Sequence, residues 1–264
     1  NRKYQNPKIS PNEKYIAYVT NQQGRYKIWL YDIENSKRKC ILKREHKIEQ
    51  ITDYSYPIIE WHPSSKILSY ITERKGKILF SRYELDEKKT SSLELFYLDK
   101  ILDYSFSQNG INLAMSASVN SQTDIYIHNL ISHTNQQITN DIADDFNPQF
   151  LNNSKQIIFS SNRKNSFANN PESKNDYQLK NDIYIADVEK DSVKIFQITN
   201  TPYINESFPY EIEKHKYIFL SDASGIINQN IAIFDSTINF IDTAIHYRYF
   251  TNIFPYSSYS RNIS

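Results

Sequence analysis

Hydrophobic and polar positions alternate over short stretches along most of the chain, and Asn, Asp, Pro, Gly or Ser residues bound each stretch. β-Branched and aromatic residues dominate these stretches, a pattern that predicts half-buried β-strands. No apolar stripe with helical spacing runs for three turns, although Leu93–Leu102 allows one short helix. The chain is therefore predicted to be all-β.

The predicted strands come in five successive pairs, each joined by a polar turn. The first members of the pairs are Tyr15–Thr20, Ile67–Thr72, Leu113–Ala117, Gln156–Ser161 and Lys216–Ser221. The second members are Lys27–Tyr31, Lys77–Phe80, Asp124–Ile127, Asp182–Ile185 and Asn230–Ile233. The steps between equivalent residues of the first members are 52, 45, 44 and 60 residues, counted at Ala17, Ser69, Ala114, Ile158 and Ile218.

Short motifs repeat with these strands. Gln-Ile-Thr-Asn ends at Asn140 and again at Asn200, and an acid-x-x-Pro element follows each copy, at Asp145–Pro148 and Glu206–Pro209. Several short strands in a repeat of this length are typical of a β-propeller blade. A single four-stranded blade cannot bury both of its faces, so blades stack on their neighbours.

The repeats occupy residues 1–235, and an aromatic-rich segment, residues 236–264, follows them. We expect a six-bladed ring, in which this segment completes the last blade; the alternative is that it leads into another domain. The polar insertion Lys164–Lys180 predicts a surface loop, with a partner-binding loop as the alternative. Because the repeats begin within six residues of Asn1, we expect the chain to be part of a longer protein.

Composition excludes several classes of partner. Lys and Arg number 31 against 30 Asp and Glu, so no overall field favours nucleic acid or an anionic membrane. The basic tract around Lys37–Lys39 and Lys43–Arg44 favours a solvated edge strand over a phosphate site. No segment is long and apolar enough to insert into a bilayer. The single cysteine, Cys40, excludes an intrachain disulfide.

The common catalytic motifs are absent from the sequence. Glycine occurs only at positions 24, 76, 110 and 225, so neither Gly-x-Ser-x-Gly nor a glycine-rich phosphate loop exists. There is no His-Glu-x-x-His motif, and the six histidines lack metal-ligand spacing. We therefore predict no catalytic residue and no cofactor in this chain.

Acidic residues recur in the segments that enter successive blades, at Asp53, Asp103, Asp144, Asp145 and Glu206. Equivalent segments of a closed ring converge on one end of its channel, so these acids would gather there. Carboxylate oxygens suit Ca²⁺, and Asp141, Asp144 and Asp145 are candidate ligands. The alternative is that the acids cap turns through backbone N–H groups.

Aromatic residues accompany these acids. Tyr54, Tyr56, Tyr104 and Phe208 lie beside them in the sequence, and they would either anchor a protein partner or pack between blades. The predicted partner-binding residues are Asp53, Tyr54, Tyr56, Asp103, Tyr104, Asp145, Glu206 and Phe208.

Two segments carry a resemblance to a known family. Ile157–Arg163 followed by Asp182–Asp187, and Asn6–Tyr18, resemble the TolB-like (PD40, WD40-like) β-propeller repeat. The resemblance covers about residues 6–235, and it is greatest to the propeller segment of large TolB-like envelope proteins of Bacteroidetes-type bacteria. The third repeat departs from the pattern because it lacks the proline after Ser105, and the fifth lacks the Ser-x-Arg turn.

The resemblance implies a periplasmic, non-catalytic scaffold that holds protein partners of the cell envelope on one face or at the channel mouth. The implied partner is a lipoprotein or an outer-membrane assembly component, but the family's contact residues do not transfer to this sequence. Two alternatives stay open. One is a carbohydrate-active propeller, either a lyase or a glycoside hydrolase. The other is the regulatory propeller of a peptidase whose catalytic domain lies outside this chain.

Overall fold

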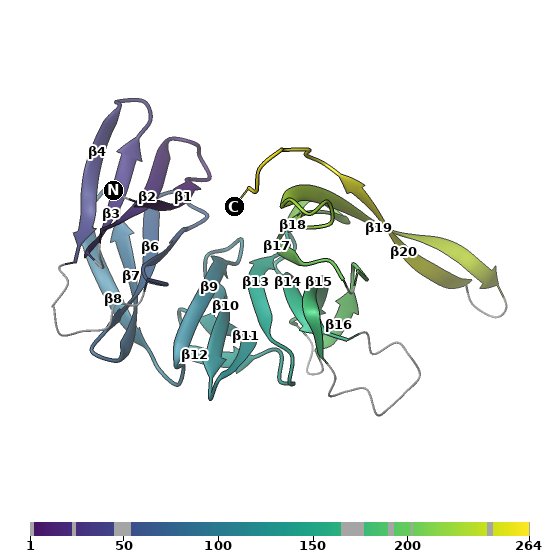
Figure 1. Cartoon of the computed structure of the whole chain (residues 1–264). Helices are drawn as coiled ribbons and strands as arrows, with labels where there is room; N and C mark the ends of the chain where they lie inside the picture. Colours follow the sequence, from purple (N-terminus) through teal and green to yellow (C-terminus); the bar gives the residue numbers. More distant parts are fainter. Residues whose placement is uncertain are drawn as a thin grey trace.

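The computed structural model describes residues 3–22, 25–44, 54–164, 177–189, 193–201, 203–241 and 245–263. These residues form strands and no helix, and the strands group into five four-stranded antiparallel sheets arranged in an arc (Figure 1). Each sheet consists of four strands that are consecutive in sequence, so each is one blade. The all-β propeller architecture predicted from the repeats is confirmed.

The five blades follow the order of the chain. The first contains β1 (Lys3–Ile9), β2 (Tyr15–Gln22), β3 (Arg25–Asp32) and β4 (Lys37–Lys43). The second contains β5 (Ile58–Trp61), β6 (Ile67–Arg74), β7 (Lys77–Glu84) and β8 (Lys89–Leu95). The third contains β9 (Lys100–Phe106), β10 (Asn112–Val119), β11 (Gln122–Asn129) and β12 (Thr134–Gln137). The fourth contains β13 (Asp145–Phe150), β14 (Gln156–Arg163), β15 (Tyr177–Asp187) and β16 (Lys194–Gln197). The fifth contains β17 (Glu206–Glu213), β18 (Lys216–Ser221), β19 (Asn228–Ile241) and β20 (Ile245–Pro255).

The predicted strand pairs are the two central strands of each blade, from β2 and β3 to β18 and β19. These strands are largely buried because neighbouring blades cover both faces of the second, third and fourth blades and one face of the first and fifth. The outer strands β4, β8 and β12 are mostly exposed and polar. The short helix allowed at Leu93–Leu102 does not form, since these residues end β8 and begin β9.

The x-Pro elements of the first strands are β-bulges. Asn6, Asn147 and Phe208 each precede a proline and have φ values of 50°, 53° and 51°. The pairing register of β1, β13 and β17 shifts at these positions. Asparagine tolerates the left-handed backbone region, but a bulky aromatic residue seldom adopts it, so the backbone at Phe208 is strained.

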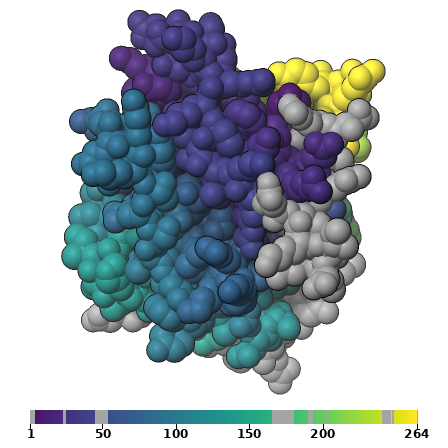
Figure 2. All heavy atoms as spheres, turned by 90° about the vertical axis from the view of Figure 1, so that its left-hand side faces the viewer, coloured from purple at the N-terminus to yellow at the C-terminus, as the bar shows by residue number. Residues whose placement is uncertain are grey.

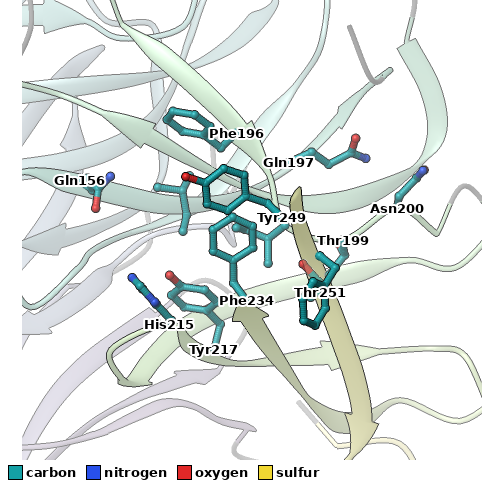
Figure 3. A pocket seen from close by; sticks show the side chains of 13 residues that line it. Gln156, Phe196, Gln197, Thr199, Asn200, His215, Tyr217, Phe234, Tyr249 and Thr251 are labelled. Carbon is teal, nitrogen blue, oxygen red and sulfur yellow. The ribbon is translucent and has the colours of Figure 1, made fainter. Parts of the chain in front are cut away.

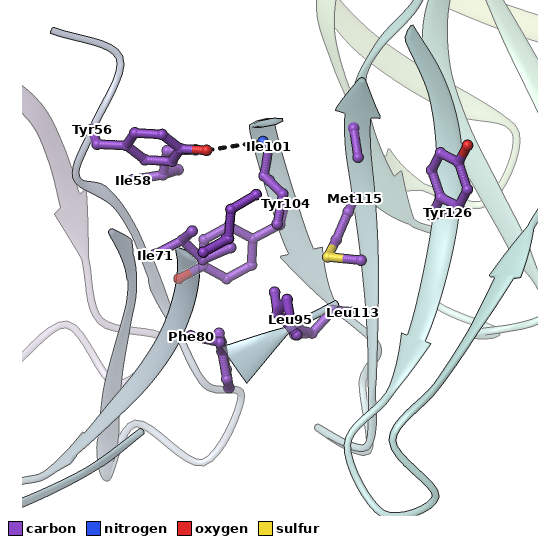
Figure 4. Close-up of a cluster of buried hydrophobic side chains, with 12 residues drawn as sticks. Tyr56, Ile58, Ile71, Phe80, Leu95, Ile101, Tyr104, Leu113, Met115 and Tyr126 are labelled. Atoms are coloured by element: carbon purple, nitrogen blue, oxygen red, sulfur yellow. Dashed lines mark hydrogen bonds between the residues drawn. The ribbon is translucent and has the colours of Figure 1, made fainter. Parts of the chain in front are cut away.

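Apolar side chains fill the space between neighbouring blades. Between the second and third blades, Ile71 and Phe80 meet Tyr104, Leu113 and Met115 (Figure 4). The hydroxyl of Tyr104 lies 2.7 Å from Ser69 Oγ, so the buried ring keeps a polar partner. Similar clusters join the first blade to the second, the third to the fourth and the fourth to the fifth. Figure 2 views the arc from the side of the first blade (purple), which packs beside the second (blue).

The described blades do not close into the predicted six-bladed ring. Residues 236–264 do not form a sixth sheet within the described ranges, because β20 pairs along the length of β19 and becomes the fourth strand of the fifth blade. After β20 the chain turns back, and the backbone N–H of Tyr259 donates to Asn228 Oδ1 at 2.7 Å. The tail is thus part of the fifth blade, and the first and fifth blades each keep one face without a neighbouring sheet (Figure 1).

Truncation after Asp235 should destabilise the domain. It removes β20, whose Ile253 packs in the cluster between the fourth and fifth blades, and it leaves β19 without its outer partner. We expect the melting temperature to fall by about 5 °C or more, since a loss of about 2 kcal/mol lowers it by several degrees in a chain of this size. Differential scanning calorimetry measures the change.

The control shortens the same hairpin without removing its inner half. Ser236 and Tyr249 are paired, so an Asn-Gly turn in place of residues 237–248 deletes only the part that projects from the blade (Figure 1). This variant should melt within about 2 °C of the unaltered protein. An unchanged melting transition in the truncation after Asp235 would show that the tail does not stabilise the fold.

Candidate functional site

Polar side chains link the first strands of the blades near the centre of the arc. Lys8 Nζ on β1 lies 2.6 Å from Glu60 Oε2 on β5. On the next two first strands, Asn147 Nδ2 donates to Asp103 Oδ2 at 3.4 Å. The backbone N–H of Phe208 on β17 then donates to Asn147 Oδ1 at 3.3 Å. We call Lys8, Glu60, Asp103 and Asn147 the inner polar row.

The inner polar row contains two acidic side chains and one basic side chain. Burial raises the pKa values of the Glu60 and Asp103 carboxyls, and the nearby Lys8 ammonium opposes this in both cases. Burial alone would lower the pKa of Lys8, but the two carboxylates outweigh it and raise that pKa. The Lys8 ammonium thus stabilises the carboxylates of both Glu60 and Asp103. The side chains of the inner polar row bind one another rather than a ligand.

Asp145 and Glu206 lie at equivalent positions, where each opens the first strand of its blade, and their exposed fractions are 0% and 1%. Arg163 Nη2 donates to both carboxylate oxygens of Asp145, at 2.8 and 2.7 Å. The Arg163 guanidinium itself lies 5.4 Å from the Phe159 ring and 5.6 Å from the Tyr184 ring. Asp145 is therefore one half of a buried ion pair.

The fifth blade lacks the equivalent arginine. The partner of Asp145 across the strands is Ser161, and the partner of Glu206 is Ser221. Two residues beyond these serines stand Arg163 and Ala223 respectively. Glu206 instead accepts a hydrogen bond from the Thr199 hydroxyl. Burial and the nearby Asp182 raise the pKa of Glu206 to about 7, although the Thr199 hydrogen bond opposes the shift.

The repeated Gln-Ile-Thr motif has a structural role at the same junctions. Gln137 Nε2 donates to Asp124 at 3.0 Å, and Gln197 Nε2 donates to Asp182 at 3.1 Å. The Thr139 hydroxyl also donates to Asp124, at 3.3 Å. The Thr199 hydroxyl lies 3.5 Å from Asp182 and donates instead to Glu206, to which it is closer. These hydrogen bonds connect the end of the outer strand of each blade to an aspartate on its third strand.

The predicted calcium ligands are engaged by protein groups. Asp141 Oδ2 lies 3.3 Å from Arg163 Nη1, and Asp144 Oδ1 accepts a hydrogen bond from the Thr123 backbone at 3.3 Å. Asp145 pairs with Arg163 as described above. Within the described ranges, no group of three or more His, Cys, Asp or Glu residues is placed to hold a metal ion.

The predicted partner-binding residues divide by exposure. Tyr56 and Tyr104 are buried between blades, where the Tyr56 hydroxyl accepts a hydrogen bond from the Ile101 backbone at 3.0 Å (Figure 4). Tyr54 and Phe208 are 61% and 58% exposed. Asp103 belongs to the inner polar row, Asp145 and Glu206 are buried, and Asp53 lies outside the described residues. Tyr54 and Phe208 therefore remain as surface candidates.

A groove of about 710 Å³ lies between the fourth and fifth blades (Figure 3). Phe196, Tyr217, Phe234 and Tyr249 line it, and none of the lining residues that the structure describes is Asp, Glu, Lys or Arg. Phe234 and Tyr249 stack with ring centroids 5.6 Å apart, and His215 meets the edge of this stack (Figure 3). The groove suits an uncharged, apolar group. The aromatic C-terminal segment was the sequence signal for it.

The residues missed by sequence reasoning are Lys8, Glu60 and Asn147, together with this groove. Asn147 had a local signal, because it occupies the pre-proline position of a repeated element. Lys8 and Glu60 lie 52 residues apart, and neither forms part of a repeated motif that would predict their contact.

Comparisons with known proteins come from two sources, and no family model matches the chain. Among curated proteins, the Tol-Pal system protein TolB of Helicobacter hepaticus is 27% identical over 192 residues, covering 52% of this chain and 45% of that protein. Among solved structures, TolB from Acinetobacter baumannii matches with a TM-score of 0.61 and 14% identity, covering 87% of this chain and 51% of that one. The chain thus spans about half the length of these two TolB proteins.

A second solved structure comes from a peptidase. The β-propeller domain of the Trilobed protease from Pyrococcus furiosus matches with a TM-score of 0.56 and 15% identity, covering 98% of this chain and 83% of that one. That domain is described as having an open velcro topology. At this identity the likeness concerns the fold alone.

Loss of Arg163 should strongly destabilise the fourth blade. Arg163→Met keeps much of the side-chain length between the two rings but leaves the Asp145 carboxylate buried without its partner, so we expect a loss of about 3–5 kcal/mol in urea unfolding. Adding Asp145→Asn should recover a large part of that loss. A single variant that loses less than about 1 kcal/mol would contradict a buried ion pair at this junction.

Stability should fall as pH rises toward neutrality because of Glu206. Its pKa rises from 4.5 to about 7 on folding, so the folded protein holds the proton more tightly than the unfolded chain. The resulting stabilisation is fully present below about pH 4.5 and is lost as pH rises to about 7, with a magnitude of about 3 kcal/mol. Asp124, whose pKa rises to about 6, acts in the same direction.

Glu206→Gln isolates this contribution, because glutamine resembles the protonated acid. Urea unfolding from pH 4.5 to 8 should show a flatter pH dependence than the unaltered protein, and higher stability at pH 8. Glu213→Gln, on the exposed end of the same strand, should leave the profile unchanged. Identical profiles for Glu206→Gln and the unaltered protein would contradict the assignment.

Proposed function

This chain is a TolB-like β-propeller, and from that premise we propose that it is a non-catalytic protein-interaction scaffold of the bacterial cell envelope. The proposed location is the periplasm, and the proposed partner is an envelope lipoprotein or an outer-membrane assembly component. The relative's name, which assigns it to the Tol-Pal system, supports an envelope partner. The position of exposed aromatic residues supports protein binding.

The observation that carries the proposal is the surface of the fifth blade. Nine of the eighteen exposed large hydrophobic side chains among the described residues lie between Tyr203 and Tyr259. Phe208 and Tyr210 lie on its uncovered face, where they line a cavity of about 580 Å³ with Tyr259 and Ile263. Aromatic residues supply most of the binding energy in many protein interfaces, so this face is suited to a partner.

Phe208 combines an exposed side chain with an unusual backbone, as Tyr97 also does, but Phe208 lies on the uncovered face of the fifth blade. Its side chain is 58% exposed, and its backbone has a φ of 51° that aromatic residues seldom adopt. Its amide is held by Asn147 of the neighbouring blade, which fixes the strained conformation. A strained and solvent-facing aromatic residue is the kind of group that binding sites retain.

Several features weigh against catalysis at the centre of the arc. The carboxyls of Glu60 and Asp103 are bound by Lys8 and Asn147, and those of Asp145 and Glu206 are buried against protein groups. A glycoside hydrolase needs two carboxyls that reach a sugar in a cleft. The acids of this chain instead hold neighbouring strands together, which supports the scaffold over a carbohydrate-active propeller.

A second candidate function is the propeller of a larger peptidase. The match to the Trilobed protease propeller over 98% of this chain favours it. Treating the full polypeptide from its host with a fluorophosphonate probe of serine hydrolases tests this candidate. Labelling of the polypeptide that contains this propeller would support the peptidase, and labelling confined to other proteins would support the scaffold.

Site-specific cross-linking tests the scaffold. A photo-reactive phenylalanine at position 210, in the full polypeptide expressed in its host, should cross-link one or a few envelope proteins. The same group at Tyr97, which is 93% exposed outside the fifth blade, should not. Phe208→Ala with Tyr210→Ala should then reduce co-purification of that partner about 30-fold or more, as expected for losing one strong anchor.

Three outcomes would count against the proposal. Equal cross-linking from positions 210 and 97 would mean that the fifth blade is not a specific surface. Cross-links confined to the polypeptide itself would mean that a further blade of the same protein covers this face, as in the six-bladed ring that the repeats imply. Co-purification of glycans without any protein would favour the carbohydrate-active alternative.

A further inference from the structure

The packed interface between the fourth and fifth blades opens outward into the aromatic groove (Figure 3). Ile185, Ile198 and Tyr217 belong both to the buried cluster between these blades and to the lining of the groove. β18 pairs with β19 only as far as Ile233, so the hairpin of β19 and β20 continues beyond β18 as a two-stranded ribbon among the described residues. The groove lies where this hairpin leaves the blade, and its volume of about 710 Å³ is typical of a ligand site.

Aromatic rings of the hairpin form one wall of the groove. Phe234 on β19 is paired with Thr251 on β20, so Tyr249, two residues before Thr251, lies on the same face. The planes of the Phe234 and Tyr249 rings differ by 5°, and Phe234 therefore lies flat against one side of Tyr249. Tyr249 is still 62% exposed, so its ring offers an open surface on which the apolar face of a ligand can stack.

The groove also contains a tyrosine hydroxyl that has no protein partner. Tyr217 is 2% exposed and lines the groove, yet its side chain forms no hydrogen bond with any residue that the structure describes (Figure 3). Buried polar groups nearly always have a partner, and an unpaired one is costly. Burial, together with the nearby Glu211, raises the pKa of Tyr217 to about 12, so the hydroxyl keeps its proton. It is therefore a donor for which a ligand would supply the acceptor.

Other polar side chains of the groove are also available to a ligand. The Asn200 amide, the His215 ring nitrogens and the Thr251 hydroxyl line it without a hydrogen bond to the described parts of the chain. Gln156 Oε1 accepts a hydrogen bond from Asn153 Nδ2 at 3.1 Å, which orients the Gln156 amide and leaves its Nε2 to donate. Amides and hydroxyls together supply both donors and acceptors. The groove thus combines apolar ring surfaces with several unpaired polar groups.

This combination narrows the chemistry of the ligand. An apolar side chain of a protein partner would stack on the rings but would leave the amides and hydroxyls without partners, which weakens binding. A sugar ring satisfies both kinds of group, because its C–H groups form apolar faces and its hydroxyls both donate and accept at its edge. Amides and hydroxyls suit uncharged hydroxyls, whereas phosphates and carboxylates are bound best by arginine and lysine.

We propose that the groove between the fourth and fifth blades binds an uncharged sugar unit of a glycan. The sugar ring stacks on Tyr249, and one of its oxygens accepts a hydrogen bond from the Tyr217 hydroxyl. None of the described lining residues carries a carboxyl group, so the proposal concerns binding and not hydrolysis. It is independent of the protein partner proposed for the fifth blade, because that partner binds the opposite face of the same sheet.

Binding of the full chain to an array of neutral and acidic oligosaccharides tests the proposal. The neutral probes are oligomers of glucose, galactose, mannose and N-acetylglucosamine. We expect the protein to retain at least one neutral class, and calorimetric titration with that oligosaccharide should show saturable binding and a raised melting temperature. Retention of acidic glycans alone, or of no glycan, would overturn the proposal.

Two substitutions separate the hydroxyl from the ring surface. Tyr217→Phe removes only the hydroxyl and should weaken binding about fivefold, while the melting temperature stays the same or rises because no protein partner is lost. Tyr249→Ala removes the stacking surface and should weaken binding about tenfold or more. Tyr97→Ala is the matched control, since Tyr97 is 93% exposed outside the groove, and it should retain full binding. Equal losses in Tyr249→Ala and Tyr97→Ala, or a clearly lower melting temperature in Tyr217→Phe, would overturn the assignment.

Two further measurements exclude other occupants and other sites. Phe196 lines the groove and is 40% exposed, so a photo-reactive phenylalanine at this position reports what fills it. Cross-linking from position 196 to an unglycosylated polypeptide would show that a protein occupies the groove and would overturn the proposal. Any glycan that co-purifies with the unaltered protein should be lost in Tyr249→Ala. Persistence of that glycan would place its site elsewhere, such as the centre of the arc, and would also overturn the proposal.

Discussion

The structure depends on one constraint: a four-stranded blade has two apolar faces, and each needs a cover. The second, third and fourth blades meet it by packing between neighbours, through clusters such as the one around Tyr104 and Phe80. This mutual burial is the main stabilising force and explains why the strand pattern repeats along the chain. Among the described residues, the first and fifth blades have a neighbouring sheet on one side only, so the outer face of each is uncovered.

Buried polar groups then affect the stability of each interface between neighbouring blades. Between the third and fourth blades, Arg163 neutralises the buried Asp145. Between the fourth and fifth blades, Ala223 stands at the position of that arginine. Glu206 there has hydroxyl groups as hydrogen-bond partners and lies near a second acid, Asp182. A buried acid without a cation is stable mainly in its protonated form. The last junction is therefore weaker at neutral pH, and it is also the one that contains the aromatic groove (Figure 3).

Sequence reasoning succeeded where the signal is local. The short alternating stretches rich in β-branched and aromatic residues located both central strands of every blade, because this pattern is set by burial of the strand itself. It placed Asp145 and Glu206 at equivalent positions but could not show that they are buried, since the covering residues lie on another strand. It expected residues 236–264 either to complete the last blade of a six-bladed ring or to lead into another domain, and in the structure β20 pairs with β19 in the fifth blade. The Lys8–Glu60 contact joins residues 52 apart and had no local signal.

The two uncovered faces differ in chemistry, and this difference limits how they are covered. The outer face of the first blade carries cations and Trp29, whereas that of the fifth carries Phe208 and Tyr210 with few charges. Two copies of the chain could associate end to end if the fifth blade of one packed on the first blade of the other. Such an interface would bury at least Lys27 and Lys43 against apolar groups, at a large desolvation penalty. End-to-end self-assembly is thus disfavoured. The two outer faces therefore differ in chemistry: cations and Trp29 lie at one end of the arc, and exposed aromatic side chains lie at the other.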